Sequence, residues 1–210
     1  THTVPMPLDL SDTLVVGITT TALFDMTESD SVFQAKYKED KNTAVAEYRE
    51  YMLKHENEAL ADGTGMPLVR ALLALNKYQQ EGQRPLVEVV VMSRNSPETG
   101  LRVLHNIRRL SLPVSRHAFT GGEPVTNYLD AFDVDLFLTT KASDAQRVTD
   151  AGICAVAHVK APPSDMGPIP EGQVRIAFDA DAVLFDESSE FLNKVEGLRS
   201  FHRNEDLKQD

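Results

Sequence analysis

The sequence predicts an α/β fold, in which helices cover both faces of a mostly parallel sheet to form a three-layer sandwich. First, short apolar, β-branched runs alternate with helical patterns at the spacing of βαβ units. Second, the run from Leu86 to Met92 is mostly valine, as expected for a central parallel strand that is buried on both faces. Third, crossovers between parallel strands are right-handed, which places the connecting helices against the faces of the sheet.

The N-terminal part of the chain predicts one strand and two helices. Residues 14–19 form a strand because they are apolar and β-branched, and residues 20–30 follow as a loop or the start of a helix. Residues 44–58 are helical because their apolar positions recur at spacings of three and four. Residues 62–65 break the chain with two glycines. A leucine-rich helix follows over residues 67–82, with a proline in the first turn, where a helix tolerates one.

The middle of the chain continues the alternation after the valine strand. Ser96 caps a helix that starts at a proline and runs through Ile107. A short strand is expected at residues 117–120. The turn at residues 121–124 contains two glycines and a proline and leads into a helix that ends near Ala131.

One further strand–helix–strand unit precedes a linker. Residues 134–139 and 153–159 are predicted strands, and a helix over residues 142–151 is closed by Gly152. Cys154 lies in the apolar second strand, and we interpret it as a core residue and not a nucleophile. A single cysteine also excludes a disulfide within the chain and suits a reducing compartment.

A proline-rich stretch divides the chain into two parts. Residues 161–170 hold four prolines and a glycine, which exclude a helix or a central strand. We therefore predict an α/β domain over residues 1–160, a linker over residues 161–172, and the start of a second α/β repeat over residues 173–210. This last part begins with an apolar strand and continues as a polar helix with one apolar side.

The composition and net charge indicate which classes of binding partner the protein disfavours. Of the 210 residues, 41% are hydrophobic and 25% are charged, as in an ordinary globular protein, and the formal net charge is −11. An acidic surface repels DNA, RNA and anionic membranes, but a local cluster of donors can still attract a small anion. No apolar run is long enough to span a bilayer, and no signal peptide is visible, so we expect a cytoplasmic protein.

The strand that begins at Val174 ends in two carboxylates, Asp179 and Asp181. Residues two apart share one side of an extended strand, and carboxylates crowded at the carboxyl edge of a sheet can hold Mg²⁺. One carboxylate could then attack phosphorus while the other transfers a proton. The pattern by itself also fits an acidic, solvated turn.

The valine strand ends in Ser93, Arg94 and Asn95, which are candidate phosphate- or substrate-binding residues. A hydroxyl and free amide groups beside a helix start can hold an anion, although a simple capped loop fits the same residues.

A weak internal repeat relates the two predicted parts. Residues 17–24 and 177–184 each combine a strand end, a corner of small residues and a short apolar run. In this alignment Thr19 faces Asp179 and Thr21 faces Asp181, so the acids occur only in the second copy. Chance similarity over eight residues remains an alternative explanation.

Longer segments resemble the cytosolic 5′-nucleotidase I family of haloacid dehalogenase-like (HAD-like) phosphohydrolases. The segments that carry the resemblance are ITTTALFDM, PLVRALLALN, VVVMSRNSPETGLRVLHNIRRLSLPVSRHAFTGGEPVTNYLDAF, VDLFLTTKASD and VRIAFDADAVLFDESSEF. They run along nearly the whole chain, which resembles the N-terminal portion of such an enzyme or a shortened relative. The resemblance implies a Rossmann-like, HAD-like fold.

The resemblance also implies a reaction, the Mg²⁺-dependent hydrolysis of nucleoside 5′-monophosphates. Asp179 would be the nucleophile that forms an aspartyl-phosphate, and Asp181 would be the general acid and then the general base. Asp179 and Asp181 would also bind the Mg²⁺. In the family, the phosphate-binding Ser/Thr, a lysine and a further acidic pair follow the D-x-D motif. The first part of this chain offers only degenerate equivalents, such as Ser93 and the Thr139-Thr140-Lys141 segment.

Three functions therefore stay open from the sequence. The chain is a 5′-nucleotidase or a portion of one, a non-catalytic nucleotide- or phosphate-binding module, or a structural or oligomerisation domain. The sequence also allows a homo-oligomer.

Overall fold

The computed structural model describes residues 10–114, 116–161 and 173–177, and these contain one five-stranded sheet. Its strands pair in the order β3-β2-β1-β4-β5, and every pairing is parallel. This is the strand order of Rossmann-like folds, so the predicted α/β class and parallel sheet are confirmed. The strands are β1 (Leu14–Thr19), β2 (Val87–Ser93), β3 (Arg116–Phe119), β4 (Leu136–Thr139) and β5 (Ala155–His158).

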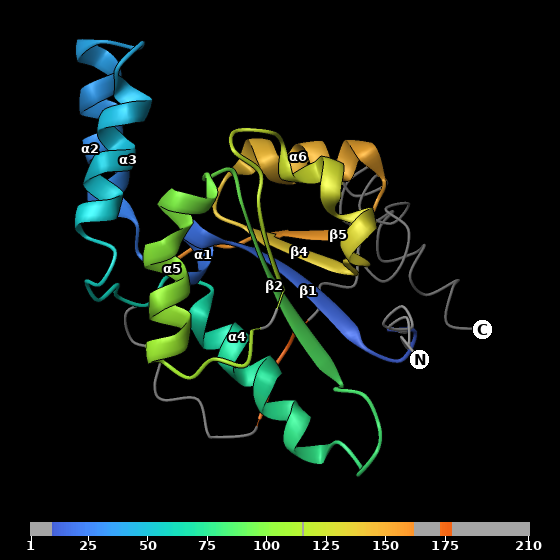
Figure 1. Cartoon of the computed structure of the whole chain (residues 1–210). Coiled ribbons are helices and arrows are strands. Elements are labelled where there is room, and N and C mark those ends of the chain that lie inside the picture. Colours follow the sequence, from blue (N-terminus) through green and yellow to red (C-terminus); the bar gives the residue numbers. More distant parts are fainter. Residues whose placement is uncertain (1–9, 115, 162–172, 178–210) are drawn as a thin grey trace, which may run out of the picture. The chain divides into compact units, whose positions relative to one another are not determined.

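Helices connect the strands and lie on both faces of the sheet (Figure 1). The α-helices are α1 (Thr20–Leu23), α2 (Thr27–Glu39), α3 (Ala44–Lys54), α4 (Met66–Ala74), α5 (Pro97–Arg109) and α6 (Ala142–Ala151). The 3₁₀ turns are η1 (Leu75–Tyr78), η2 (Val125–Tyr128) and η3 (Asp130–Phe132). One hydrophobic cluster joins the sheet to α3, α4 and α5, and a second joins it to η2 and α6. Each cluster lies between the sheet and the helices on one of its faces, which gives the three layers of the predicted sandwich.

The central strands alternate between these two clusters. On β1, Val15 belongs to the second cluster and Val16 to the first, and β2 alternates in the same way. Every residue of β2 is buried, as its valine content predicts. Glu88 on this strand is buried with its charge paired, because Arg116 of β3 donates to its two carboxylate oxygens at 2.7 and 2.8 Å.

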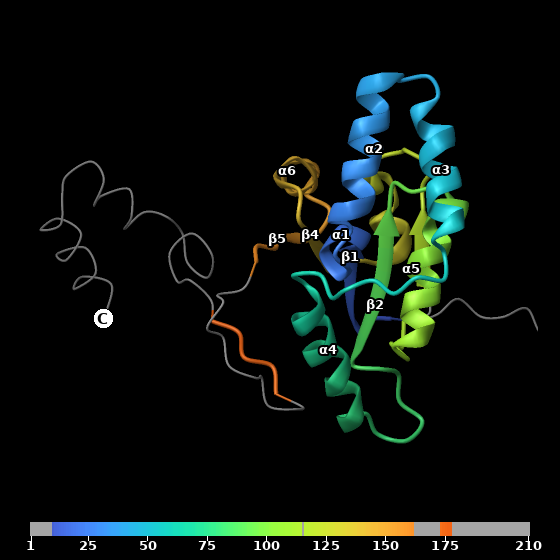
Figure 2. The ribbon, with the colours of Figure 1, turned by 90° about the vertical axis from the view of Figure 1, so that its left-hand side faces the viewer.

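The α2–α3 hairpin is inserted between β1 and β2. Figure 2 shows both helices projecting beyond the end to which the β2 arrow points. Phe33 of α2 packs edge-on against Tyr48 of α3, with ring centroids 5.2 Å apart. The hairpin therefore stands beside the carboxyl ends of the strands.

Several element boundaries differ from the sequence prediction. The chain after β1 forms α1 and then a helix that continues to Glu39, whereas a loop or helix start was expected only over residues 20–30. The leucine-rich helix changes to 3₁₀ geometry at Leu75 and ends at Tyr78, not near Gly82. The helix expected to end near Ala131 is instead the pair of 3₁₀ turns η2 and η3.

The predictions for the C-terminal part of the chain, from residue 153 on, can be compared with the structure only where residues are described. Strand β5 is shorter than predicted, and Cys154 before it is only half-buried against the second cluster. Residues 173–177 carry no strand assignment where a strand was expected to begin at Val174. The chain divides into two compact units, Thr1–Val174 and Arg175–Asp210. Of the predicted linker over residues 161–172, all but Ala161 lies outside the described residues, and so does the segment 178–210.

Candidate functional site

The carboxyl ends of β1, β2 and β4 meet at one edge of the sheet. In the order 3-2-1-4-5 the chain reverses its direction of winding between β1 and β4, and ligands bind at such switch points in open α/β sheets. Three short segments follow these strands here: Thr20–Thr21 after β1, Arg94–Asn95 after β2 and Thr140–Lys141 after β4. The edge is therefore the first place to look for a site.

Hydroxyl groups link the three segments. The Oγ1 of Thr20 lies 3.2 Å from the Oγ of Ser93, and the Oγ1 of Thr21 lies 2.9 Å from that of Thr140. The Oγ1 of Thr19 is 3.4 Å from that of Thr21. Either oxygen of each pair can donate the proton, so the network can reorient its donors.

The predicted binding residues after β2 line a cavity of about 80 Å³ at this edge. Ser93 is buried, and its Oγ accepts a hydrogen bond from the Asn95 N–H at 3.2 Å. Ser96 caps α5 as predicted, because its Oγ accepts from the Thr99 N–H at 3.4 Å. Ser93, Arg94 and Asn95 thus all line one cavity, and the bonds to the Ser93 and Ser96 hydroxyls also fit a capped loop.

Four charged side chains border the same cavity. An Arg94 Nη2 donates to Asp144 at 2.6 Å, and Asp144 is buried, so this pair neutralises itself. Asp30 of α2 and Lys141 are the other two. Burial raises the pKa of Asp30, and the charge of Lys141 opposes that rise. The four formal charges cancel, in contrast to the acidic molecule as a whole.

Tyr48 of α3 covers the cavity from the hairpin side. Burial raises its pKa to about 12, with smaller contributions from Asp30 and Tyr51, while Arg102 lowers it. The folded protein therefore keeps this proton at a pH where the unfolded chain, with its pKa near 10, loses it. The stability due to Tyr48 is fully present below pH 10 and is lost as the pH rises through about 12.

We expect Tyr48→Phe to flatten this loss. Between pH 10 and 12 the free energy of unfolding should fall by up to about 1.4 kcal/mol per pH unit more in the wild type than in Tyr48→Phe. Urea denaturation across this range measures the difference. Tyr78→Phe is the matched control because Tyr78 is 62% exposed. Equal slopes in Tyr48→Phe and the wild type would contradict the assignment.

A second hollow, of about 360 Å³, adjoins the first and shares Thr21, Met26 and Asp30 with it. Its far side is formed by the segment 62–64, where Asp62 pairs with Arg70. Gly63 is required there, because a Cβ at this position would lie 2.5 Å from the carbonyl oxygen of Ala22. The Oγ1 of Thr64 is buried without a hydrogen-bond partner.

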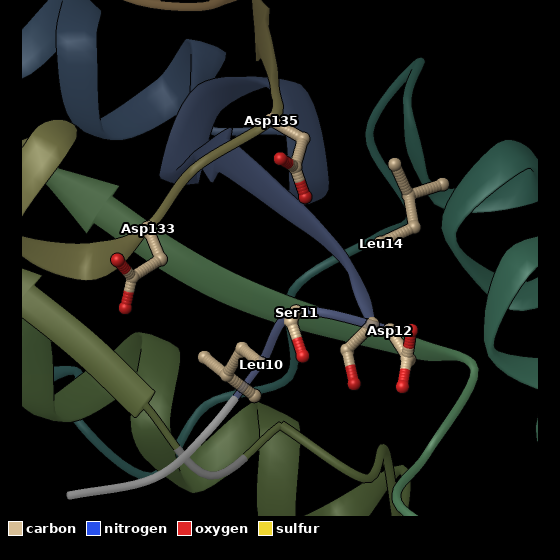
Figure 3. Close-up of a pocket in the computed structure, with 7 residues that line it drawn as sticks. Leu10, Ser11, Asp12, Leu14, Asp133 and Asp135 are labelled. Atoms are coloured by element: carbon tan, nitrogen blue, oxygen red, sulfur yellow. The ribbon is translucent and has the colours of Figure 1, made fainter.

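The opposite edge of the sheet carries a larger hollow, of about 710 Å³ (Figure 3). Figure 3 shows the carboxylates of Asp12, Asp133 and Asp135 around it. Asp135 has a structural role there, because its Oδ2 accepts a hydrogen bond from the Val15 N–H at 2.8 Å. Since its charges are all acidic, this edge is unsuited to an anionic ligand.

The remaining predicted site residues, Asp179 and Asp181, lie outside the described residues, so their roles stay predictions. Within the described part of the chain, no group of three His, Cys, Asp or Glu side chains could hold a metal ion. The sequence reasoning did not assign Asp30, Tyr48 and Asp144 to the site. Lys141 was noted only because it follows a predicted strand, and this position was the one feature of the sequence that pointed to it.

Comparison with known proteins identifies the family to which the sequence is similar. A family model described as 5′-nucleotidase matches residues 6–210. Human cytosolic 5′-nucleotidase 1B is 28% identical over 206 residues, which are 97% of this chain and 32% of the relative. The chain thus spans about a third of the length of this curated relative. No solved structure matches this chain.

Proposed function

This chain belongs to the 5′-nucleotidase family, and on that premise we propose that it acts in the Mg²⁺-dependent hydrolysis of nucleoside 5′-monophosphates. The observation that carries the proposal is that the family match extends through the D-x-D motif at Asp179 and Asp181. A cytoplasmic location is proposed with it, and so is a small-molecule substrate in place of DNA or RNA, which the acidic surface repels.

The proposed chemistry uses the two carboxylates in sequence. Asp179 attacks phosphorus and forms an aspartyl-phosphate, while Asp181 donates a proton to the departing 5′-oxygen of the nucleoside. Asp181 then removes a proton from water, which attacks the aspartyl-phosphate and releases inorganic phosphate. Both carboxylates offer the oxygen ligands that Mg²⁺ prefers, and a bound Mg²⁺ supplies positive charge that offsets the repulsion between the anions.

The described residues support placing the hydrolytic step at the D-x-D motif and not at the edge of the described sheet. At the carboxyl edge of the first sheet, β1 ends in threonines where the second copy of the internal repeat has aspartates. These hydroxyls are poor Mg²⁺ ligands by comparison, and among the described residues no group of three His, Cys, Asp or Glu side chains could hold a metal ion. We therefore assign the hydrolytic step to Asp179 and Asp181 alone.

The test is release of inorganic phosphate from AMP and IMP by the full chain. We expect release in the presence of Mg²⁺ and none when EDTA replaces it. Adenosine 3′-monophosphate is the control substrate, because a site that positions a 5′-phosphate should hydrolyse it far more slowly. Release that is unaffected by EDTA, or no release from either 5′-monophosphate, would contradict the proposal.

A further inference from the structure

We propose that the carboxyl edge of β1, β2 and β4 is a second site, which binds the phosphate group of a phosphorylated small molecule without a metal ion and without hydrolysing it. This inference goes beyond the proposed hydrolysis and does not depend on it, because it rests on residues of the first sheet alone.

Hydrogen-bond donors gather at this edge from three separate parts of the chain. Thr20 and Ser93 join their hydroxyls across β1 and β2, and Thr21 joins Thr140 across β1 and β4. A hydroxyl can donate to a phosphate oxygen, whereas a carboxylate can only repel it. Each hydroxyl pair has a proton free to rotate toward a ligand, since a pair needs only one proton for its own contact.

Lys141 supplies the positive charge. Its side chain borders the cavity, and it forms no ion pair within the described residues. Arg94 differs, because its guanidinium is held by Asp144 at 2.6 Å. A lysine ammonium is a mobile point charge that can follow a phosphate, so Lys141 is the cation expected to move onto the ligand. Asp30 lines the same cavity, and the charge of Lys141 lowers the pKa of its carboxyl against the rise caused by burial.

The same residues lack the means to cleave a phosphate ester. In the internal alignment Thr19 and Thr21 stand where the second copy has Asp179 and Asp181. A threonine hydroxyl is a weak nucleophile unless a base removes its proton. Of the two carboxylates at the cavity, Asp144 is neutralised by Arg94, and Asp30 faces Lys141. The site should therefore hold a phosphate and leave it intact.

The two adjoining hollows suggest how a ligand divides between them. The smaller one, of about 80 Å³, carries Ser93 and Lys141 and suits a phosphate group. The larger one, of about 360 Å³, shares Thr21 and Met26 with it and leaves room for the organic part. A phosphorylated small molecule such as a nucleoside monophosphate fits this arrangement better than a bare nucleoside.

The experiment uses the full chain carrying Asp179→Asn and Asp181→Asn, so that the proposed hydrolytic site is removed, in buffer with EDTA. Isothermal titration calorimetry measures binding of inorganic phosphate, AMP and adenosine. We expect AMP to bind, phosphate to bind more weakly and to compete with AMP, and adenosine not to bind. Phosphate release is followed in the same samples and should be absent.

Single substitutions in that background locate the site. Lys141→Gln should weaken AMP binding about tenfold, because it removes a charge-assisted contact. Lys54→Gln, which removes the same charge from an exposed position at the end of α3, should leave binding unchanged. Thr21→Val keeps the shape, removes the hydroxyl and should weaken binding about threefold. Circular dichroism confirms that each variant is folded.

The outcomes separate this proposal from the hydrolytic one. No binding of AMP in EDTA, or equal effects of Lys141→Gln and Lys54→Gln, would overturn the second site and leave Mg²⁺-dependent hydrolysis untouched. Adenosine binding as tightly as AMP would also overturn it, because the phosphate would then contribute nothing. Conversely, a wild-type chain without hydrolysis could still bind AMP at this edge.

Discussion

Asp179→Asn is expected to lower the turnover of nucleoside 5′-monophosphates by about 10⁴-fold or more, because the amide cannot form the aspartyl-phosphate. It also removes a negative ligand for Mg²⁺. Phosphate release from AMP under saturating Mg²⁺ measures the effect. Asp186→Asn is the matched control, since it makes the same change just outside the motif. Activity within about tenfold of the wild type in Asp179→Asn would show that another group is the nucleophile.

The role of Asp181 can be separated by the choice of leaving group. Asp181→Asn should slow release from AMP by about 10²- to 10⁴-fold, the usual contribution of a general acid or base. With p-nitrophenyl phosphate the phosphorylation step needs no proton donor, because the phenolate leaves unaided. The burst of p-nitrophenol should therefore survive while turnover stays slow. Loss of the burst would contradict a general-acid role.

Asn106→Ala is expected to lower the free energy of unfolding by about 3 kcal/mol, because it leaves buried backbone groups without partners. Asn106 is 1% exposed. Its Oδ1 accepts from the Leu60 N–H at 2.9 Å, and its Nδ2 donates to the Glu58 carbonyl at 2.9 Å. These bonds tie α5 to the segment that leads to residues 62–64, which line the hollow of about 360 Å³.

Urea denaturation at neutral pH measures this loss. Asn57→Ala provides the control, because Asn57 is exposed and bonds only weakly to Glu56, at 3.4 Å; its change should stay within about 0.5 kcal/mol. Asn106→Asp keeps the acceptor for the Leu60 N–H and loses the donor to the Glu58 carbonyl. Arg109, which already donates to the Oδ1 at 2.7 Å, can pair with the new charge. The loss in unfolding free energy should therefore lie between those of Asn57→Ala and Asn106→Ala. A loss below about 1 kcal/mol in Asn106→Ala would show that the segment relaxes.

The sequence predicted the sheet well because burial leaves a strong pattern. The valines of β2 are buried on both faces, and no helix surface requires that composition. The polar helix α2 was missed beyond its start because only Ser29 in it is buried, so its apolar periodicity is faint. It is held by packing on α3, through contacts such as Phe33 with Tyr48, and such tertiary support cannot be seen locally.

The segment between β3 and β4 illustrates a second limit. A helix that ends near Ala131 was expected after the turn at residues 121–124. The chain instead forms two 3₁₀ turns that end at Asp133, which has a left-handed φ of 53°. Val125 and Leu129 are buried there against the sheet. Packing of these two side chains decides the local geometry, and propensity over so short a segment is too weak to oppose it.

The candidate site was predictable to the extent that it follows strand ends. Ser93, Arg94 and Asn95 were selected because they end a strand beside a helix start, and the structure places all three in the lining of one cavity. Asp30 and Tyr48 were not, because Asp30 in the first turn of α2 and Tyr48 within α3 reach the edge only through the hairpin. Asp179 and Asp181 stay predictions of the sequence and of the family.

The hairpin of α2 and α3 sits in a single connection, between β1 and β2, while the sheet's register is set by the strands. The pairing of the strands therefore does not fix the length of the hairpin, whereas Tyr48 and Met52 of α3 join it to the first hydrophobic cluster. This one connection contributes Met26, Asp30 and Tyr48 to the lining of the cavity. If the edge binds a ligand as proposed, exchanging the hairpin between relatives is expected to change the ligand preference.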